Sequence, residues 1–132
     1  MSETINYKEI QTGIKFNFRI NGNYDNMYEL AKLISRNEDR NQIIIDLINS
    51  IKNKKIVVLS NFLEQKILLS TRMSLNQNVI FMTFKEFTTY KEKYDTVILI
   101  SGQIYFNFKE GIEYIEIFDE SELTRIFKRL AI

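Results

Sequence analysis

The 132-residue chain contains 18 lysines and arginines against 17 aspartates and glutamates, and it has no cysteine, histidine, proline or tryptophan. Without cysteine and histidine, disulfides, zinc–thiolate sites, thiol nucleophiles and most hydrolase triads are excluded, and we expect no cofactor. The net charge of +1 predicts neither a nucleic-acid nor an acidic partner, so such binding needs a local patch.

The length suits one domain, and we expect a single α/β domain over residues 1–132, with residues 1–14 as an N-terminal arm. No apolar run approaches the length of a membrane span, and residues 1–7 lack the pattern of a signal peptide. We therefore expect a cytoplasmic protein.

The first elements in chain order are an edge strand and two helical segments. Residues 15–20 alternate polar and apolar side chains, which predicts a strand with one wet face. A turn at residues 21–23 precedes helical spacing of apolar residues up to Ser35. Ser35 and Glu38 have capping-box spacing, and the helix that they would open carries one apolar stripe: Ile43, Ile44, Leu47, Ile48 and Ile51.

Three strands follow at residues 56–60, 79–82 and 97–100, each apolar on consecutive positions. Continuous apolarity predicts burial on both faces, as in a parallel sheet covered by helices. Apolar runs hand over to capping pairs at Asn61–Glu64, Thr83–Glu86 and Asp119–Glu122, which predicts strand-to-helix transitions.

The end of the chain predicts two strands and a closing helix. Residues 103–108 and 113–118 alternate around Gly111, which favours a hairpin or two strands at one edge of the sheet. Residues 120–130 carry an apolar stripe and predict a final helix. The expected fold is therefore α/β: a three-layer, mostly parallel sheet like a RecA-like or Rossmann-like half, with an antiparallel edge.

Candidate chemistry is sparse. Four dispersed glycines make a phosphate-binding loop improbable, and the polar residues after the inner strands are more simply helix caps than ligand contacts. Asp95 and Asp119 form a conceivable carboxylate pair, although turn and cap chemistry explains both. We expect no catalytic and no metal-binding residues.

Three surfaces are candidates for nucleic-acid or partner contact. An aromatic segment with a neighbouring lysine suits base stacking, although strand aromatics are more often core: Ile104, Tyr105, Phe106, Phe108 and Lys109. Two basic clusters could touch phosphates or simply be solvated faces: Arg125, Lys128 and Arg129, or Lys52, Lys54 and Lys55. The strand edges at residues 15–20 and 103–108 are the predicted docking places for a protein partner.

The order of these elements resembles the second RecA-like domain of superfamily 2 helicases of viral and phage type. The matching segments are an Arg40-Asn41 helix start, the Val-Leu-Ser strand ending at Ser60, the strand ending at Thr83, the Asp95-Thr-Val-Ile strand and a late strand ending at Asp119. The resemblance covers residues 10–129 and implies that Arg40 and Asn41 belong to a contact site. The family's arginine-finger motif is missing from residues 100–113, which implies a catalytically dead relative.

Length and composition also resemble the small RNA polymerase subunit of yeast cytoplasmic linear plasmids. We expect a non-catalytic accessory subunit of a viral-type or plasmid-encoded transcription or replication complex, bound to a larger polymerase or helicase subunit. Nucleic-acid contact would then be indirect. The alternatives are a phage or mobile-element inhibitor of a host enzyme, and a fragment of a nucleic-acid-dependent ATPase.

Overall fold

The computed structural model describes residues 6–14, 29, 32–60, 62–101 and 109–118. Within these ranges the elements follow in the order β1 (Asn6–Gln11), α2 (Glu38–Ser50), β2 (Ile56–Ser60), α3 (Leu63–Arg72), β3 (Val79–Met82), α4 (Phe84–Thr88), β4 (Thr96–Ser101) and β5 (Glu113–Phe118). Residues 32–36 are also helical. No described helix is long and apolar enough to cross a membrane.

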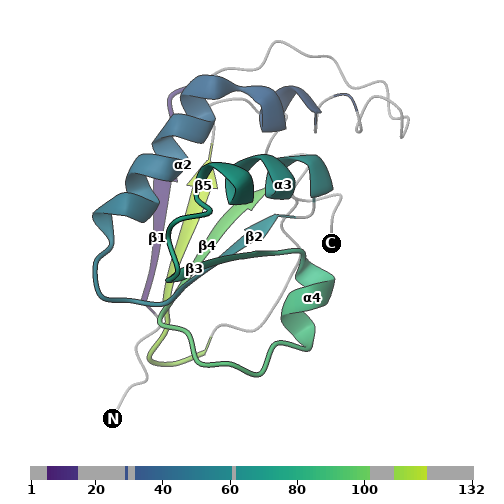
Figure 1. Ribbon diagram of the computed structural model, residues 1–132. Helices are drawn as coiled ribbons and strands as arrows, with labels where there is room; N and C mark the ends of the chain where they lie inside the picture. Colours follow the sequence, from purple (N-terminus) through teal and green to yellow (C-terminus); the bar gives the residue numbers. More distant parts are fainter. Residues whose placement is uncertain (1–5, 15–28, 30–31, 61, 102–108, 119–132) are drawn as a thin grey trace.

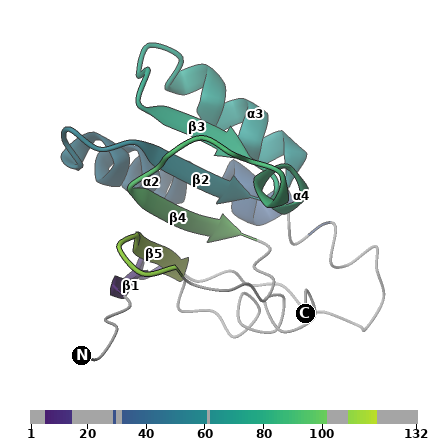
Figure 2. The same cartoon turned by 90° about the horizontal axis from the view of Figure 1, so that it is seen from below.

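The five strands form one sheet in the order β1-β5-β4-β2-β3, and every pairing is parallel. The order can be followed across Figure 2. The α/β class and the parallel sheet predicted from the continuous apolar strands are confirmed. At the carboxyl end of β2 the pairing with β4 shifts register after Leu59, so that Ser60 pairs with Ser101.

Two features of the predicted sheet need correction. β5 pairs in parallel with both β4 and β1, so the antiparallel edge expected there is wrong. β1 lies inside residues 1–14, which were predicted to be an arm. Its residues are mostly polar and almost all exposed, so β1 lacks the apolar run on which the prediction relied. The predicted edge strands at residues 15–20 and 103–108 lie outside the described residues.

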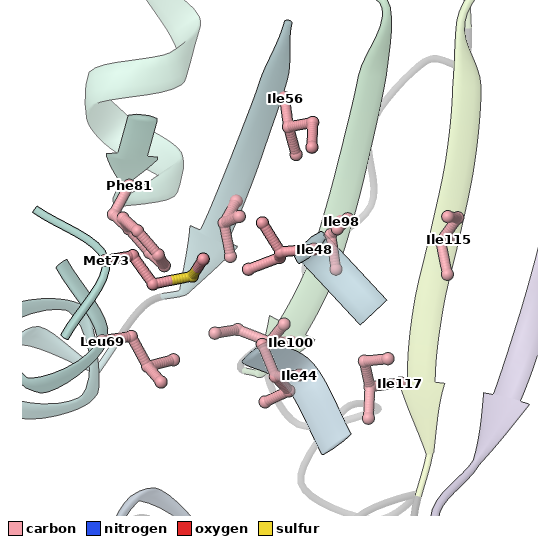
Figure 3. Packing of buried hydrophobic residues seen from close by; sticks show 11 residues of the cluster. Ile44, Ile48, Ile56, Leu69, Met73, Phe81, Ile98, Ile100, Ile115 and Ile117 are labelled. Carbon is pink, nitrogen blue, oxygen red and sulfur yellow. The ribbon is translucent and has the colours of Figure 1, made fainter. Parts of the chain in front are cut away.

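The two faces of the sheet carry separate apolar clusters. On one face, α2 and α3 lie over the strands, as Figure 1 shows, and the cluster joins Ile44 and Ile48 of α2 to Leu69 and Met73 around α3. Figure 3 shows these side chains directed at Ile98 and other strand residues. On the other face, Val57, Leu59, Met82, Val97, Leu99 and Tyr114 pack with aromatic side chains from α4 and the segment after it. The predicted three layers are therefore present.

The helix starts show which capping predictions hold. Thr83 and Glu86 form the predicted capping box at α4. The predicted Ser35 cap is wrong, because Asn37 is the N-cap of α2. Its backbone is extended, and its side-chain oxygen accepts a hydrogen bond from the backbone amide of Arg40 at 2.8 Å. α3 has Phe62 at its N-cap without a side-chain cap bond. Asn61 and the Asp119–Glu122 pair lie outside the described residues.

Candidate functional site

Arg40 and Asn41, the residue pair carried by the helicase resemblance, are buried in the first turns of α2. An Arg40 guanidinium nitrogen donates to the carbonyl of Ile100 near the end of β4. The Asn41 amide donates to the carbonyl of Ser35 at 2.9 Å. Both side chains tie α2 to its surroundings, so in this chain they are positioned as structural groups and are not exposed for a partner.

A second buried polar pair lies where β2 passes into α3. The Ser60 hydroxyl donates to the Gln65 side-chain oxygen at 2.8 Å and accepts the amide of Phe62 at 3.1 Å. This arrangement holds the backbone amide of Phe62, the N-cap residue of α3, and so ties the end of β2 to the start of the helix. The polar side chain after this strand therefore serves the helix start, as the simpler interpretation of the sequence held.

Most of the predicted contact residues lie outside the described part of the chain: Ile104, Tyr105, Phe106, Phe108, Arg125, Lys128 and Arg129. Lys109 is described and exposed. Its backbone amide donates to the Tyr114 hydroxyl at 2.7 Å, and its ammonium lies 5.8 Å from the centre of the Tyr94 ring. Lys109 therefore sits just before β5, over an aromatic side chain.

The conceivable carboxylate pair finds no support in the topology. Asp95 directly precedes β4, and its carboxylate accepts the backbone amide of Lys55 at 2.8 Å. Asp119 lies outside the described residues, and in the sequence it follows the end of β5, which runs parallel to β4. Asp95 therefore fastens the loop before β2 to the loop before β4. Among the described residues, no group of three or more metal-ligating side chains is placed to hold a metal ion.

The parallel strands β2, β4 and β5 all begin at the same end of the sheet, and the loops that enter them carry exposed lysines. We name this set the lysine edge: Lys52, Lys54, Lys55, Lys91, Lys93 and Lys109. Backbone hydrogen bonds hold these loops together. The amide of Asp95 donates to the carbonyl of Lys55 at 2.9 Å, and the amide of Glu113 donates to the carbonyl of Asp95 at 3.0 Å. The three loops that carry these lysines thus meet where their strands begin.

Only Lys52, Lys54, Lys55 and Lys109 of this edge had drawn attention in the sequence. Lys91 and Lys93 were missed, because they precede β4 by a few residues and form no run of basic residues. A signal existed, since both groups lie just before inner strands that were expected to be parallel. Parallel strands begin at the same edge, so loops far apart in sequence meet there.

An open depression of about 670 Å³ lies at this edge, lined by Asn6, Tyr7, Asn53, Lys54, Asp95, Gly111, Ile112 and Glu113. Asn53 and Gly111 both have positive φ, at 59° and 84°, a conformation that Asn and Gly tolerate best. The depression therefore sits between tight turns, beside the lysine edge, with both basic and acidic side chains in its lining.

A hydrogen-bonded acidic cluster joins the edge strand β1 to β5. The Tyr7 hydroxyl donates to the buried Glu116 carboxylate at 2.5 Å and lies 3.3 Å from Glu9. Burial raises the pKa of the Tyr7 hydroxyl, and the hydrogen bond to Glu116 raises it further by a smaller amount. Burial also raises the pKa of Tyr114. Tyr7 thus stays protonated and supplies a donor to a carboxylate that would otherwise be costly to bury.

The sheet ends in two described edge strands of different character. β1 carries Lys8 and Glu9, and charges on an edge oppose pairing with another strand. β3 consists of Val79, Ile80, Phe81 and Met82, without any charge. Ile80 keeps 37% of its surface exposed. β3 is therefore the less protected of the two edges.

No protein-family model, no curated protein and no solved structure matches this chain.

Proposed function

We propose that this chain is a non-catalytic interaction module that binds a larger protein by taking up an extended segment along β3. The observation that carries the proposal is an edge strand without charge, proline or glycine. Such a strand presents unpaired backbone groups together with apolar side chains, the combination used in recognition by strand addition.

The backbone of β3 has groups available for a partner strand. The amide of Ile56 donates to the carbonyl of Asn78 at 2.8 Å, and Ile56 pairs with Val79. In a parallel ladder, alternate residues of a strand bond to opposite neighbours. Because Asn78 bonds to β2, the N–H and C=O groups of Val79 and Phe81 are directed away from β2. A partner segment would bond to these groups and cover the exposed part of Ile80.

The complex that we propose is a viral-type or plasmid-encoded transcription or replication assembly, with a polymerase or helicase subunit as the partner. This part of the proposal rests on the resemblance of residues 10–129 to the second RecA-like domain of superfamily 2 helicases. An inhibitor of a host enzyme would use the same edge, so the identity of the partner separates the two functions.

The test compares two substitutions in the full-length chain that each replace an aliphatic side chain by lysine. Ile80→Lys puts a charge on the β3 edge, whereas Leu75→Lys makes the same change at a residue that is 96% exposed in the turn before β3. Both variants are expressed with an affinity tag in the cells from which the chain comes, and the bound proteins are identified by mass spectrometry.

We expect Ile80→Lys to lose a polymerase or helicase subunit that the wild type and Leu75→Lys retain. Equal retention by both variants would refute docking at β3, and a host nuclease as the sole partner would favour inhibition. Magnesium-dependent ATPase activity with DNA or RNA that disappears in Asp95→Asn would instead show an enzyme.

A further inference from the structure

The lysine edge differs from the basic surface on the α2 and α3 side, because none of its lysines is engaged in an ion pair within the described residues. On the α2 and α3 side, the basic residues are held in ion pairs: Arg36 with Glu64, Lys66 with Glu86 and Arg72 with Glu38, each at 2.7 Å. Within the described ranges, no lysine of the lysine edge forms a salt bridge. The six lysines are exposed, with the Lys109 ammonium lying over the Tyr94 ring, and no described carboxylate is paired with them.

The local charge at this edge is positive although the whole chain is nearly neutral. The loops that enter β2, β4 and β5 hold six lysines and four carboxylates, namely Glu92, Asp95, Glu110 and Glu113, which leaves +2 against +1 for the entire chain. Asp95 is further engaged by the amide of Lys55. The surface is thus moderately basic, and the lysines outnumber the carboxylates that could neutralise them.

The spacing of the loops lets these lysines act on one ligand. Neighbouring strands lie about 4.8 Å apart, so the loops entering β2, β4 and β5 fall within about 10 Å across the sheet. The Debye length at physiological salt is about 8 Å, so charges on the loops of adjacent strands, about 4.8 Å apart, act together on one ligand, whereas charges two strands apart are more strongly screened. An extended polyanion running along the edge would meet several ammonium groups at once.

An aromatic cluster lies directly beneath one of these lysines. The Tyr94 ring is 5.5 Å from the Phe87 ring and 6.1 Å from the Tyr90 ring, with Lys109 above it. Phe87, Tyr90 and Tyr94 pack against the apolar cluster of the second sheet face, and this packing holds the segment that carries Lys91 and Lys93. The backbone amide of Lys109 is held separately by the Tyr114 hydroxyl. The backbone positions of Lys91, Lys93 and Lys109 are therefore supported by contacts within the fold.

We propose that the lysine edge binds the phosphate backbone of nucleic acid. The six exposed ammonium groups would contact successive phosphates, and the neighbouring depression would accept the sugar or base between them. Contacts of this kind are independent of sequence and fall steeply with salt, because binding releases counterions from the phosphates. This inference does not rest on the proposed docking at β3, since it uses a different edge of the sheet.

The test uses charge-matched double variants of the full chain. Lys54→Gln with Lys93→Gln removes two lysines from the lysine edge, one from each of two loops. Lys8→Gln with Lys85→Gln removes two exposed lysines that lie elsewhere and that form no ion pair within the described ranges. All four side chains are exposed, so both variants should unfold at the same urea concentration as the wild type.

Binding is measured by fluorescence anisotropy with labelled 20-mers of single-stranded DNA, single-stranded RNA and duplex DNA, from 50 to 200 mM KCl. A plot of log K against log salt has a negative slope, and each lost phosphate contact reduces its magnitude by about 0.7 for single strands and about 0.9 for duplex DNA. We expect the lysine-edge variant to lose roughly 1.4 to 1.8 from this slope and to bind at least tenfold more weakly at 50 mM KCl. The control variant should keep the wild-type slope.

Three outcomes would overturn the proposal: no salt-dependent binding by the wild type, an unchanged slope in the lysine-edge variant, or equal weakening of both variants. The last would show a dependence on net charge alone. The comparison of the three probes then distinguishes single strands from duplex as the nucleic acid that is held, and each of these results supports phosphate recognition.

Discussion

Thr96 offers a sharp test of how the amino edge of the sheet is built. Its side chain is fully buried at the start of β4, and its hydroxyl has no hydrogen-bond partner within the described structure. A buried hydroxyl without a partner costs about 1 to 3 kcal/mol of folding free energy. Thr96→Val keeps the β-branched shape that suits a strand and replaces the hydroxyl by a methyl group.

We expect Thr96→Val to raise the free energy of unfolding by about 1 kcal/mol, the lower end of that range, because the added methyl group must fit a packed site. For a chain of this size the melting temperature should rise by about 3 to 6 °C. Urea unfolding followed by circular dichroism measures the change, and the slope with denaturant should stay constant.

The matched control is Thr96→Ser, which keeps the hydroxyl and removes the methyl group. It should lower the stability by about 1 kcal/mol, the value of one buried methyl group. If Thr96→Val instead destabilised the chain by 1 kcal/mol or more, the hydroxyl would have a partner such as a buried water molecule, and the reasoning would fail.

Three further predictions concern contacts that hold the sheet and its helices. Tyr7→Phe removes the donor to buried Glu116 and should lower the free energy of unfolding by about 1 to 3 kcal/mol in urea titrations at pH 7. The pKa of Tyr7 is raised in the folded chain above the ordinary tyrosine value of about 10, so the free energy of unfolding should fall as the pH rises above 10. In Tyr7→Phe this fall should be shallower. The part that remains comes from Tyr114, whose pKa is also raised. Thr83→Ala removes the capping box of α4 and should lower the free energy of unfolding by about 1 kcal/mol in the same titrations. Ile98→Ala should lower it by about 2 to 5 kcal/mol, because Ile98 is fully buried in the first apolar cluster.

Each of these predictions has its own opposing result. If stability fell equally steeply above pH 10 in Tyr7→Phe and in the wild type, burial and the hydrogen bond to Glu116 would not raise the pKa of Tyr7 in the folded chain. A Thr83→Ala variant as stable as the wild type would mean that α4 needs no cap. A cost below 1 kcal/mol for Ile98→Ala would place that side chain outside the packed core.

The continuous apolar strands β2 and β4 were predictable because burial on both faces removes the need for alternation, whereas β3 carries the same pattern at a sheet edge where Ile80 stays exposed. β2, β3 and β4 appear close to their predicted bounds, and Thr83 and Glu86 cap α4 through side chains only three positions apart. Local chemistry of this kind is visible in any sequence that carries it. β1 was not predictable by the same reasoning, because an exposed edge strand lacks an apolar signature.

The interpretation of single polar residues was less secure, because their roles depend on neighbours distant in sequence. Arg40 looked like a contact residue beside Asn41, yet it reaches the carbonyl of Ile100. Asp95 looked like half of a carboxylate pair, yet it accepts the amide of Lys55. Only the folded arrangement brings these partners within hydrogen-bonding distance.

The sequence by itself determined that the chain forms an α/β sheet with parallel inner strands, because hydrophobic burial dictates which segments lie inside. The tertiary structure alone decided which strands are neighbours, which edge lacks charges, and which lysines share a surface. These properties arise from contacts between segments separated by tens of residues, such as those that place the loops of Lys55, Asp95 and Glu113 side by side. Both proposed binding surfaces belong to this second kind of information.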